Sequence, residues 1–128
     1  MKLDATLLFS ENQSIAAGTV NSTNVLEIGT DSVANPLLID VKLSTGLTGG
    51  KMTKVKVQSS ADRAFTTAVD EVEITVPSAI VQTKPCTVAT FYAPIKVGNR
   101  FVRLSYTLGT GATGGKVFAG YTTGSQIR

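Results

Sequence analysis

Three carboxylates close together in the sequence are the side chains best placed to do chemistry. Asp70, Glu71 and Glu73 span four positions, and acidic groups at such spacing can serve as an acid–base pair or as calcium ligands. In a strand expected over residues 71–76, however, Glu71 and Glu73 both point outward, and no DxDxDG loop surrounds them. The pattern therefore indicates a solvated strand face.

Other kinds of catalysis lack the residues they need. The chain has no histidine and a single cysteine, Cys86, so the commonest general base and metal ligand is missing and no internal disulfide can form. A lone free cysteine usually packs as a small buried hydrophobe. The glycine-rich stretch 109–115 is not followed by the Lys-Ser or Lys-Thr of a phosphate-binding loop. We therefore expect no enzyme, no metal site and no cofactor.

The length and composition indicate one folded domain over residues 1–128. Hydrophobic residues make up 42% of the chain and charged residues 16%, which is enough apolar material for a core. Asp4 interrupts the apolar run at the N-terminus, so we expect neither a secretory signal nor a membrane span. The protein is therefore expected to be made in, and to stay in, a reducing cytoplasm until it is assembled or released.

Short segments of alternating apolar and polar residues recur along the chain and are separated by turn residues. The clearest strands are expected at 37–43, 51–58, 71–76, 87–92 and 101–108, with shorter apolar stretches at 15–20, 24–28, 95–97 and 116–121. No helical period extends beyond about two turns. The pattern predicts an all-β, antiparallel β-sandwich that is jelly-roll-like, although the sequence does not separate this fold from an immunoglobulin-like sandwich.

The alternation also assigns side chains to faces of the sheets. The inward positions are expected to be Leu37, Ile39, Val41 and Leu43 in one strand, Thr53, Val55 and Val57 in the next, and Val102, Leu104, Tyr106 and Leu108 near the C-terminus. Glycines at 109–115 then break the pattern, because glycine reaches the positive φ angles of turns. We therefore expect residues 101–121 to form a β-hairpin with a long glycine-rich tip.

The polar connection between residues 59 and 70 contains one large apolar side chain. Asp62 can accept hydrogen bonds from backbone N–H groups within this loop, and Phe65 is expected to pin the loop to the core. Pro94 confines the strand before it to an edge of its sheet or to a bend.

Positive charge is concentrated in the second part of the chain. Residues 1–50 carry two basic and five acidic side chains, whereas residues 51–128 carry ten basic and four acidic ones. The basic residues are spread singly along the strands, which is not the pattern of a nucleic-acid site. Phe101 and Tyr121 are the aromatic rings expected to be most exposed, which is too few for a sugar or oligonucleotide site. Two interpretations of the basic residues remain: they form a solvated sheet face, or they form a surface that docks on an acidic protein.

Four segments, in order along nearly the whole chain, resemble a known family. They are MKLDATLLFSENQSI, NSTNVLEIG, VKVQSSADRAFTT and RFVRLSYTLGTGATGGKVFAG. The most specific residues are Gln58, Ser60, Asp62, Phe65, Arg103, Leu104, Tyr106, Gly109, Gly111 and Gly115. In these segments the chain resembles the capsid cement, or decoration, proteins of short-tailed dsDNA phages, the Bordetella-phage cement protein family.

The resemblance implies a non-enzymatic virion protein with a jelly-roll fold. Such a protein is made in the host bacterial cytoplasm and binds the outer surface of an expanded HK97-type capsid, where it bridges neighbouring capsomers. The implied partners are the major capsid protein and further copies of the chain itself, as dimers or less favourably trimers. Direct nucleic-acid or membrane partners are not implied. A phage tail or host-surface adhesin that binds a carbohydrate is the alternative.

The candidate contact residues follow from this expectation. Residues 1–9 form either an extended arm that reaches a neighbour or a strand of the sandwich. The candidate contacts with the capsid or with another copy are Leu3, Leu7, Phe9, Lys54, Lys56, Arg100, Phe101 and Arg103. The basic residues among them are expected to face acidic capsid surface.

Overall fold

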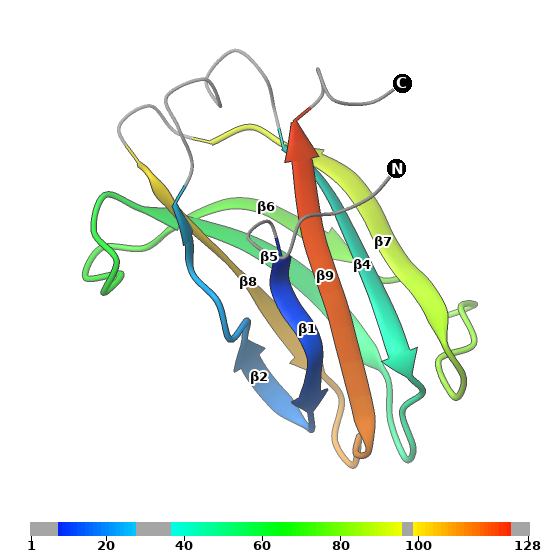
Figure 1. The fold of residues 1–128 in the computed structure, drawn as a ribbon. Coiled ribbons are helices and arrows are strands. Elements are labelled where there is room, and N and C mark those ends of the chain that lie inside the picture. Colours follow the sequence, from blue (N-terminus) through cyan, green and yellow to red (C-terminus); the bar gives the residue numbers. More distant parts are fainter. Residues whose placement is uncertain (1–7, 28–36, 96–98, 124–128) are drawn as a thin grey trace.

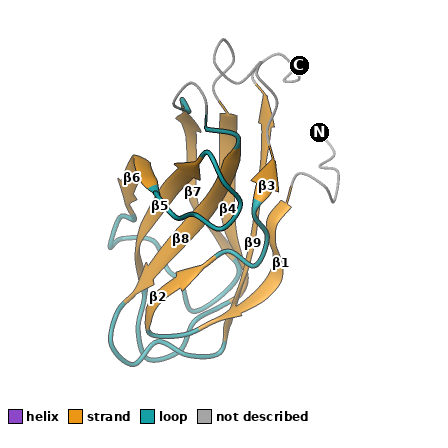
Figure 2. Cartoon of the chain, turned by 90° about the vertical axis from the view of Figure 1, so that its left-hand side faces the viewer, coloured by secondary structure: helices purple, strands orange, loops and turns teal. Residues whose placement is uncertain are grey.

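The computed structural model describes residues 8–27, 37–95 and 99–123 (Figure 1). The strands in these ranges are β1 (Leu8–Ile15), β2 (Gly18–Asn21), β3 (Leu26–Glu27), β4 (Leu37–Thr45), β5 (Met52–Ser60), β6 (Val69–Thr75), β7 (Cys86–Ala93), β8 (Phe101–Leu108) and β9 (Gly115–Thr123). They form two antiparallel sheets that face each other, with the loops gathered at the ends of the sandwich (Figure 2). The expected all-β sandwich is confirmed.

The strands pair in a nested order. One sheet has the order β1-β9-β4-β7 and the other β2-β8-β5-β6, and β3 continues the pairing of β2 along β8. The first strand therefore pairs with the last, β2 with β8, β4 with β7, and β5 with β6 across a short connection. No helix that could span a membrane occurs in the described ranges.

In two strands the expected alternation correctly identifies the side chains that lie in the core. Ile39 and Val41 in β4 are fully buried, as are Val102, Leu104 and Tyr106 in β8. These side chains meet between the two sheets in one continuous apolar cluster. The side chain of Leu37 lies outside the described part of the chain.

The expected hairpin over residues 101–121 is wrong, because β8 and β9 belong to opposite sheets. Residues 109–114 cross from one sheet to the other, and Thr113 in this connection forms an isolated bridge with Thr48. The Gly109 N–H also donates to the carbonyl of Lys51 at 2.8 Å. Alternation identifies which face of a strand is buried, but it does not identify the neighbouring strand.

Bulges change two expected orientations in the second sheet. A register shift between Met52 and Lys54 buries Met52 and exposes Thr53, so the expected inward position of Thr53 is wrong. A second shift pairs Asp70 with Gln58, and Glu71 is half-buried and accepts a hydrogen bond from Ser59. Asp70 therefore takes the outward place expected for Glu71.

The N-terminal strands also differ from expectation. Ile15 ends β1 and Gly18 begins β2 with a φ of 101°, so residues 15–20 are a corner between sheets rather than one strand. Ile95 is buried but lies outside any strand, and residues 96 and 97 lie outside the described chain. Strand β7, which precedes Pro94, is an edge strand as expected.

A candidate docking surface

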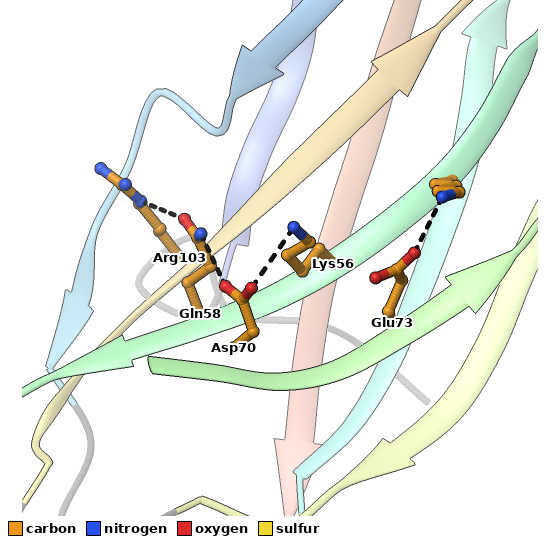
Figure 3. A network of polar contacts seen from close by, with 6 residues as sticks. Lys56, Gln58, Asp70, Glu73 and Arg103 are labelled. Carbon is orange, nitrogen blue, oxygen red and sulfur yellow. Dashed lines mark hydrogen bonds and ion pairs between the residues drawn. The ribbon is translucent and has the colours of Figure 1, made fainter. Parts of the chain in front are cut away.

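The outer face of β5 and β8 brings three of the candidate basic residues together (Figure 3). Lys54 and Lys56 project from alternate positions of β5, and the strand register places Arg103 of β8 opposite Gln58. The pairing of β5 with β8 therefore puts Lys54, Lys56 and Arg103 on one face of the sheet.

Each of the two lysines on this face forms an ion pair within the chain. The Nζ atom of Lys54 lies 3.1 Å from a carboxylate oxygen of Glu73, and that of Lys56 lies 3.4 Å from Asp70. Such exposed pairs contribute at most about 1 kcal/mol each to folding. They nevertheless offset the lysine charges, so the lysines present less free positive charge than the sequence suggests.

Asp70 links Lys56 to Gln58 and, through it, to Arg103. The amide Nε2 of Gln58 donates to Asp70 at 2.9 Å. This hydrogen bond, followed by the interactions with Lys56, lowers the pKa of Asp70. The chain of contacts runs from Arg103 through Gln58 and Asp70 to Lys56 (Figure 3).

Arg103 differs from the lysines because its partners are neutral. Its Nε donates to the side-chain oxygen of Gln58 at 2.9 Å, and its guanidinium lies 4.3 Å from the centre of the Phe65 ring. Within the described ranges no carboxylate forms an ion pair with it. Arg103 therefore retains its full positive charge at the surface.

Asp62 shapes the loop that carries Phe65. Its carboxylate accepts hydrogen bonds from the hydroxyl of Ser60 at 2.9 Å and from the backbone N–H and hydroxyl of Thr66 at 3.3 and 2.9 Å. These bonds lower the pKa of Asp62. The expected acceptance of a backbone N–H bond is confirmed.

Phe65 itself adopts a conformation that bulky residues rarely take. Its φ is 54°, in the left-handed region that costs about 1–3 kcal/mol for such a side chain. The ring is buried, but it lies outside the continuous core cluster and under Arg103. Phe65 therefore pins its loop to the outer face of the sheet, not to the core as expected.

Two further arginines surround Phe101 at the start of β8. The guanidinium groups of Arg63 and Arg100 lie 4.9 and 5.9 Å from the centre of its ring. Both arginines also contact the carboxylate of Glu27, with Arg63 at 3.9 Å and Arg100 by a short hydrogen bond. Arg63 was missed in the sequence, where only its place beside Asp62 in the segment ADRAF draws attention to it.

We refer to Arg63, Phe65, Arg100, Phe101 and Arg103 as the arginine–phenylalanine cluster. It combines three guanidinium groups with two aromatic rings, and Glu27 is the one carboxylate paired with it in the described ranges. Arginine forms bidentate hydrogen bonds with carboxylates, and arginine and aromatic residues are enriched at protein interfaces. The composition and charge of the cluster fit an acidic protein surface.

Of the remaining candidate contacts the structure describes Phe9, which is not on this surface. Phe9 is fully buried in β1, with its ring centre 5.7 Å from that of Tyr121 in β9. Its proposal as a surface contact is therefore wrong, because this part of the N-terminal segment is a core strand. Leu3 and Leu7 lie outside the described residues.

The expected exposure of the aromatic rings also needs correction. Tyr121 is 8% exposed, whereas Tyr92 on β7 is 57% exposed. Tyr121 faces the core because it alternates along β9 with the buried side chains of Val117 and Ala119. Tyr92 projects from the outer side of an edge strand.

Metal ligands among the described residues, and comparisons with protein families and curated proteins, do not assign the chain. The described residues contain no group of three or more histidine, cysteine, aspartate or glutamate side chains that could hold a metal ion. Comparison with protein-family models found no matching family. Comparison with curated proteins found no match either.

Proposed function

We propose that this chain is a non-enzymatic cement protein that binds the outer surface of an HK97-type phage head and bridges neighbouring capsomers. The observation that carries the proposal is the arginine–phenylalanine cluster, a positively charged group at the surface of one sheet in which Arg63 and Arg100 are exposed. The ordered resemblance of four sequence segments to phage cement proteins supports the same function.

The strand order supports the jelly-roll part of the proposal. A jelly roll consists of two sheets built from eight strands in two Greek keys. Two Greek keys place the first strand beside the last. The observed order, β1-β9-β4-β7 facing β2-β8-β5-β6, agrees with this arrangement.

The proposed mechanism is mechanical. Internal DNA pressure pushes capsomers apart, and a rigid sandwich that contacts both sides of a seam adds contact area where the shell is weakest. Many identical copies on one repetitive lattice multiply a modest interface into a large total stabilisation. The proposed partners are the major capsid protein and other copies of the chain, with no direct contact to nucleic acid or membrane.

Co-sedimentation of the purified protein with undecorated, expanded phage heads tests the proposal. We expect saturable binding at copy numbers comparable to those of the major capsid protein, weakened at high salt because the cluster is charged. The Arg63→Ala/Arg103→Ala variant should bind at least about tenfold more weakly.

Lys84→Ala/Lys116→Ala is the matched control, since both lysines are exposed and lie outside the cluster. Loss of binding by this control to the same extent would show that only net charge matters. A folded protein that does not bind heads at all would contradict the proposal, and a glycan screen would then test the adhesin alternative.

A further inference from the structure

Docking through the arginine–phenylalanine cluster and the lysines beside it buries the charges that this surface carries. A charged side chain that leaves water without an oppositely charged partner is costly, whereas a paired one is tolerated. The basic side chains that already have a carboxylate within the chain are Lys54, Lys56, Arg63 and Arg100. Arg103 is half-buried and has none within the described ranges. It is therefore the residue for which a partner has to supply the opposite charge.

The hydrogen bond with Gln58 determines which side of the Arg103 guanidinium is available. An ionised carboxylate only accepts hydrogen bonds, so Gln58 presents its amide Nε2 to Asp70 and its side-chain oxygen to Arg103. That oxygen accepts from Nε, and the outer end of the Arg103 side chain points away from Gln58 and Asp70 (Figure 3). The Nη1 and Nη2 groups form no hydrogen bond in the described part of the chain. Such a pair of N–H groups matches the two oxygens of a carboxylate.

The guanidinium of Arg103 also rests on an aromatic ring that is itself held in place. The centre of the Phe65 ring lies 4.3 Å from it. Phe65 is buried and has a φ of 54°, and strained backbone of this kind clusters at ligand and switch sites. Hydrogen bonds from Ser60 and Thr66 to Asp62 order the loop around Phe65. Arg103 therefore loses little conformational freedom when it binds, which favours affinity.

We propose that Arg103 binds one aspartate or glutamate side chain of the major capsid protein through its Nη1 and Nη2 groups. The inference rests on the proposed capsid binding and names the contact that positions the chain on the head. Gln58 and Phe65 act as positioning residues, because they hold the guanidinium from one side and from below.

The surrounding charges favour a single carboxylate over a polyanion. Asp70 and Glu73 lie on the same face beside the lysines, and Glu27 lies between Arg63 and Arg100. A nucleic acid carries a phosphate at every nucleotide and brings a row of negative charges against these acids. One protein carboxylate adds a single negative charge at the place where positive charge is in excess.

A charge-conserving substitution separates this contact from general attraction between charges. Lysine keeps the positive charge of arginine but lacks the planar fork that binds both carboxylate oxygens. In rebinding to undecorated, expanded heads, Arg103→Lys should bind at least about tenfold more weakly than the wild type. Lys84→Arg is the matched control, because it also conserves charge at an exposed position outside the cluster. It should bind as tightly as the wild type.

The same variant identifies the chemistry of the partner. On heads saturated with Arg103→Lys, a water-soluble carbodiimide activates protein carboxylates, and the introduced amine attacks an adjacent one to form an amide. Mass spectrometry should find position 103 joined to an aspartate or glutamate of the major capsid protein. The wild type should give no such link, because a guanidinium does not react in this way.

Circular dichroism checks that each variant is folded. If Arg103→Lys does not fold, Gln58→Glu takes its place, since it offers Arg103 a carboxylate from its own chain that competes with the partner's. Gln58→Glu should bind at least about tenfold more weakly than Lys84→Ala, which lowers the net charge by the same amount.

The outcomes separate this inference from the proposed function. Wild-type binding together with equally tight binding by Arg103→Lys would overturn the inference and leave the proposed function standing. Saturated heads that give no cross-link from position 103 to the major capsid protein would do the same. Heads that bind no wild-type protein would contradict both.

Discussion

The hydroxyl of Tyr106 lies 2.8 Å from the hydroxyl of Ser10, so one hydrogen bond joins β8 of one sheet to β1 of the other inside the sandwich. Ser10 also donates to the side-chain oxygen of Gln13 at 2.6 Å, which leaves Tyr106 as the donor to Ser10. Burial raises the pKa of Tyr106, and the bond to Ser10 offsets this only in part. A neutral phenol therefore holds the two sheets in register across an apolar core.

Removing this bond should destabilise the protein measurably. Tyr106→Phe and Ser10→Ala should each lower the free energy of unfolding by about 1–2 kcal/mol, because each leaves a buried polar partner less well satisfied. The double variant should lose less than the sum, since both changes remove the same bond. Urea denaturation of the four proteins measures this coupling, and strict additivity would show that the bond contributes nothing.

Gln82 acts as a substitute for a strand partner. Its side-chain oxygen accepts from the N–H of Met52 at 2.8 Å, and its Nε2 donates to the Met52 carbonyl at 3.0 Å. Gln82→Ala should therefore cost about 2–4 kcal/mol, since two buried backbone groups lose their partners. The exposed neighbour Val81 provides the control, and Val81→Ala should change stability by less than about 0.5 kcal/mol. Equal effects of the two changes would exclude this role for Gln82.

Two glycines should respond very differently to alanine. A methyl group at Gly46 would overlap the backbone of Thr83, whereas one at Gly18 would meet no atom within 4 Å. Gly46→Ala should cost more than about 3 kcal/mol or prevent folding. Gly18→Ala should cost only about 1 kcal/mol for its positive φ. Thermal denaturation compares them, and similar midpoints would contradict the close approach of the loop at Gly46.

Acidification should lower the free energy of unfolding, because two carboxylates on the side of the second sheet lose their stabilising charge. The pKa values of Asp62 and Asp70 in the folded protein are lowered from 3.8. A carboxylate with a lowered pKa adds stability that is present above its unfolded pKa and lost as the pH falls through the folded pKa. Stability should therefore decrease from about pH 5 to about pH 2.

The Asp70→Asn variant tests how much of the stability lost at low pH is due to Asp70. The variant should be less stable than the wild type at neutral pH and lose less stability on acidification, because position 70 no longer titrates. Urea denaturation at a series of pH values measures both effects. Parallel pH curves for the two proteins would assign the acid sensitivity to other groups.

Reversing the lysines of the outer face should affect the proposed capsid binding less than removing the arginines. Lys54→Glu/Lys56→Glu should still fold, although it places new carboxylates beside Glu73 and Asp70. Like charges opposite each other in a sheet destabilise it by roughly 0.2–1 kcal/mol per pair. We expect weaker attachment in rebinding to stripped heads, and full occupancy would exclude the lysines from the docking surface.

Alternation predicted the buried faces of β4 and β8 because their inward positions are all large and apolar, as in Ile39 and Leu104. It could not predict β1, where Glu11 to Ser14 are polar and two register shifts interrupt the pattern. It also could not show that β8 and β9 separate into different sheets, since partner choice depends on packing across the whole sandwich.

The candidate docking surface was predictable only in part. Strand alternation pointed Lys54 and Lys56 outward from one strand and Arg103 outward from another. It could not show that these strands are neighbours, or that Glu73 and Asp70 offset the lysines. Those acids come from a neighbouring strand whose bulge shifts the register. Arg63 reaches Phe101 from a loop whose shape depends on the hydrogen bonds of Asp62, and a linear sequence does not reveal such a contact.

The pairing of the first strand with the last constrains how the chain can fold during synthesis. Strand β9 lies between β1 and β4, so until it leaves the ribosome the sheet lacks a central member and β1 has no neighbour. Contacts between such distant segments carry a large loop-closure cost, which slows folding. We expect a nascent chain that ends before residue 115 to expose the apolar faces of both strands, so that the synthesis of β9 becomes the event that permits the sandwich to close.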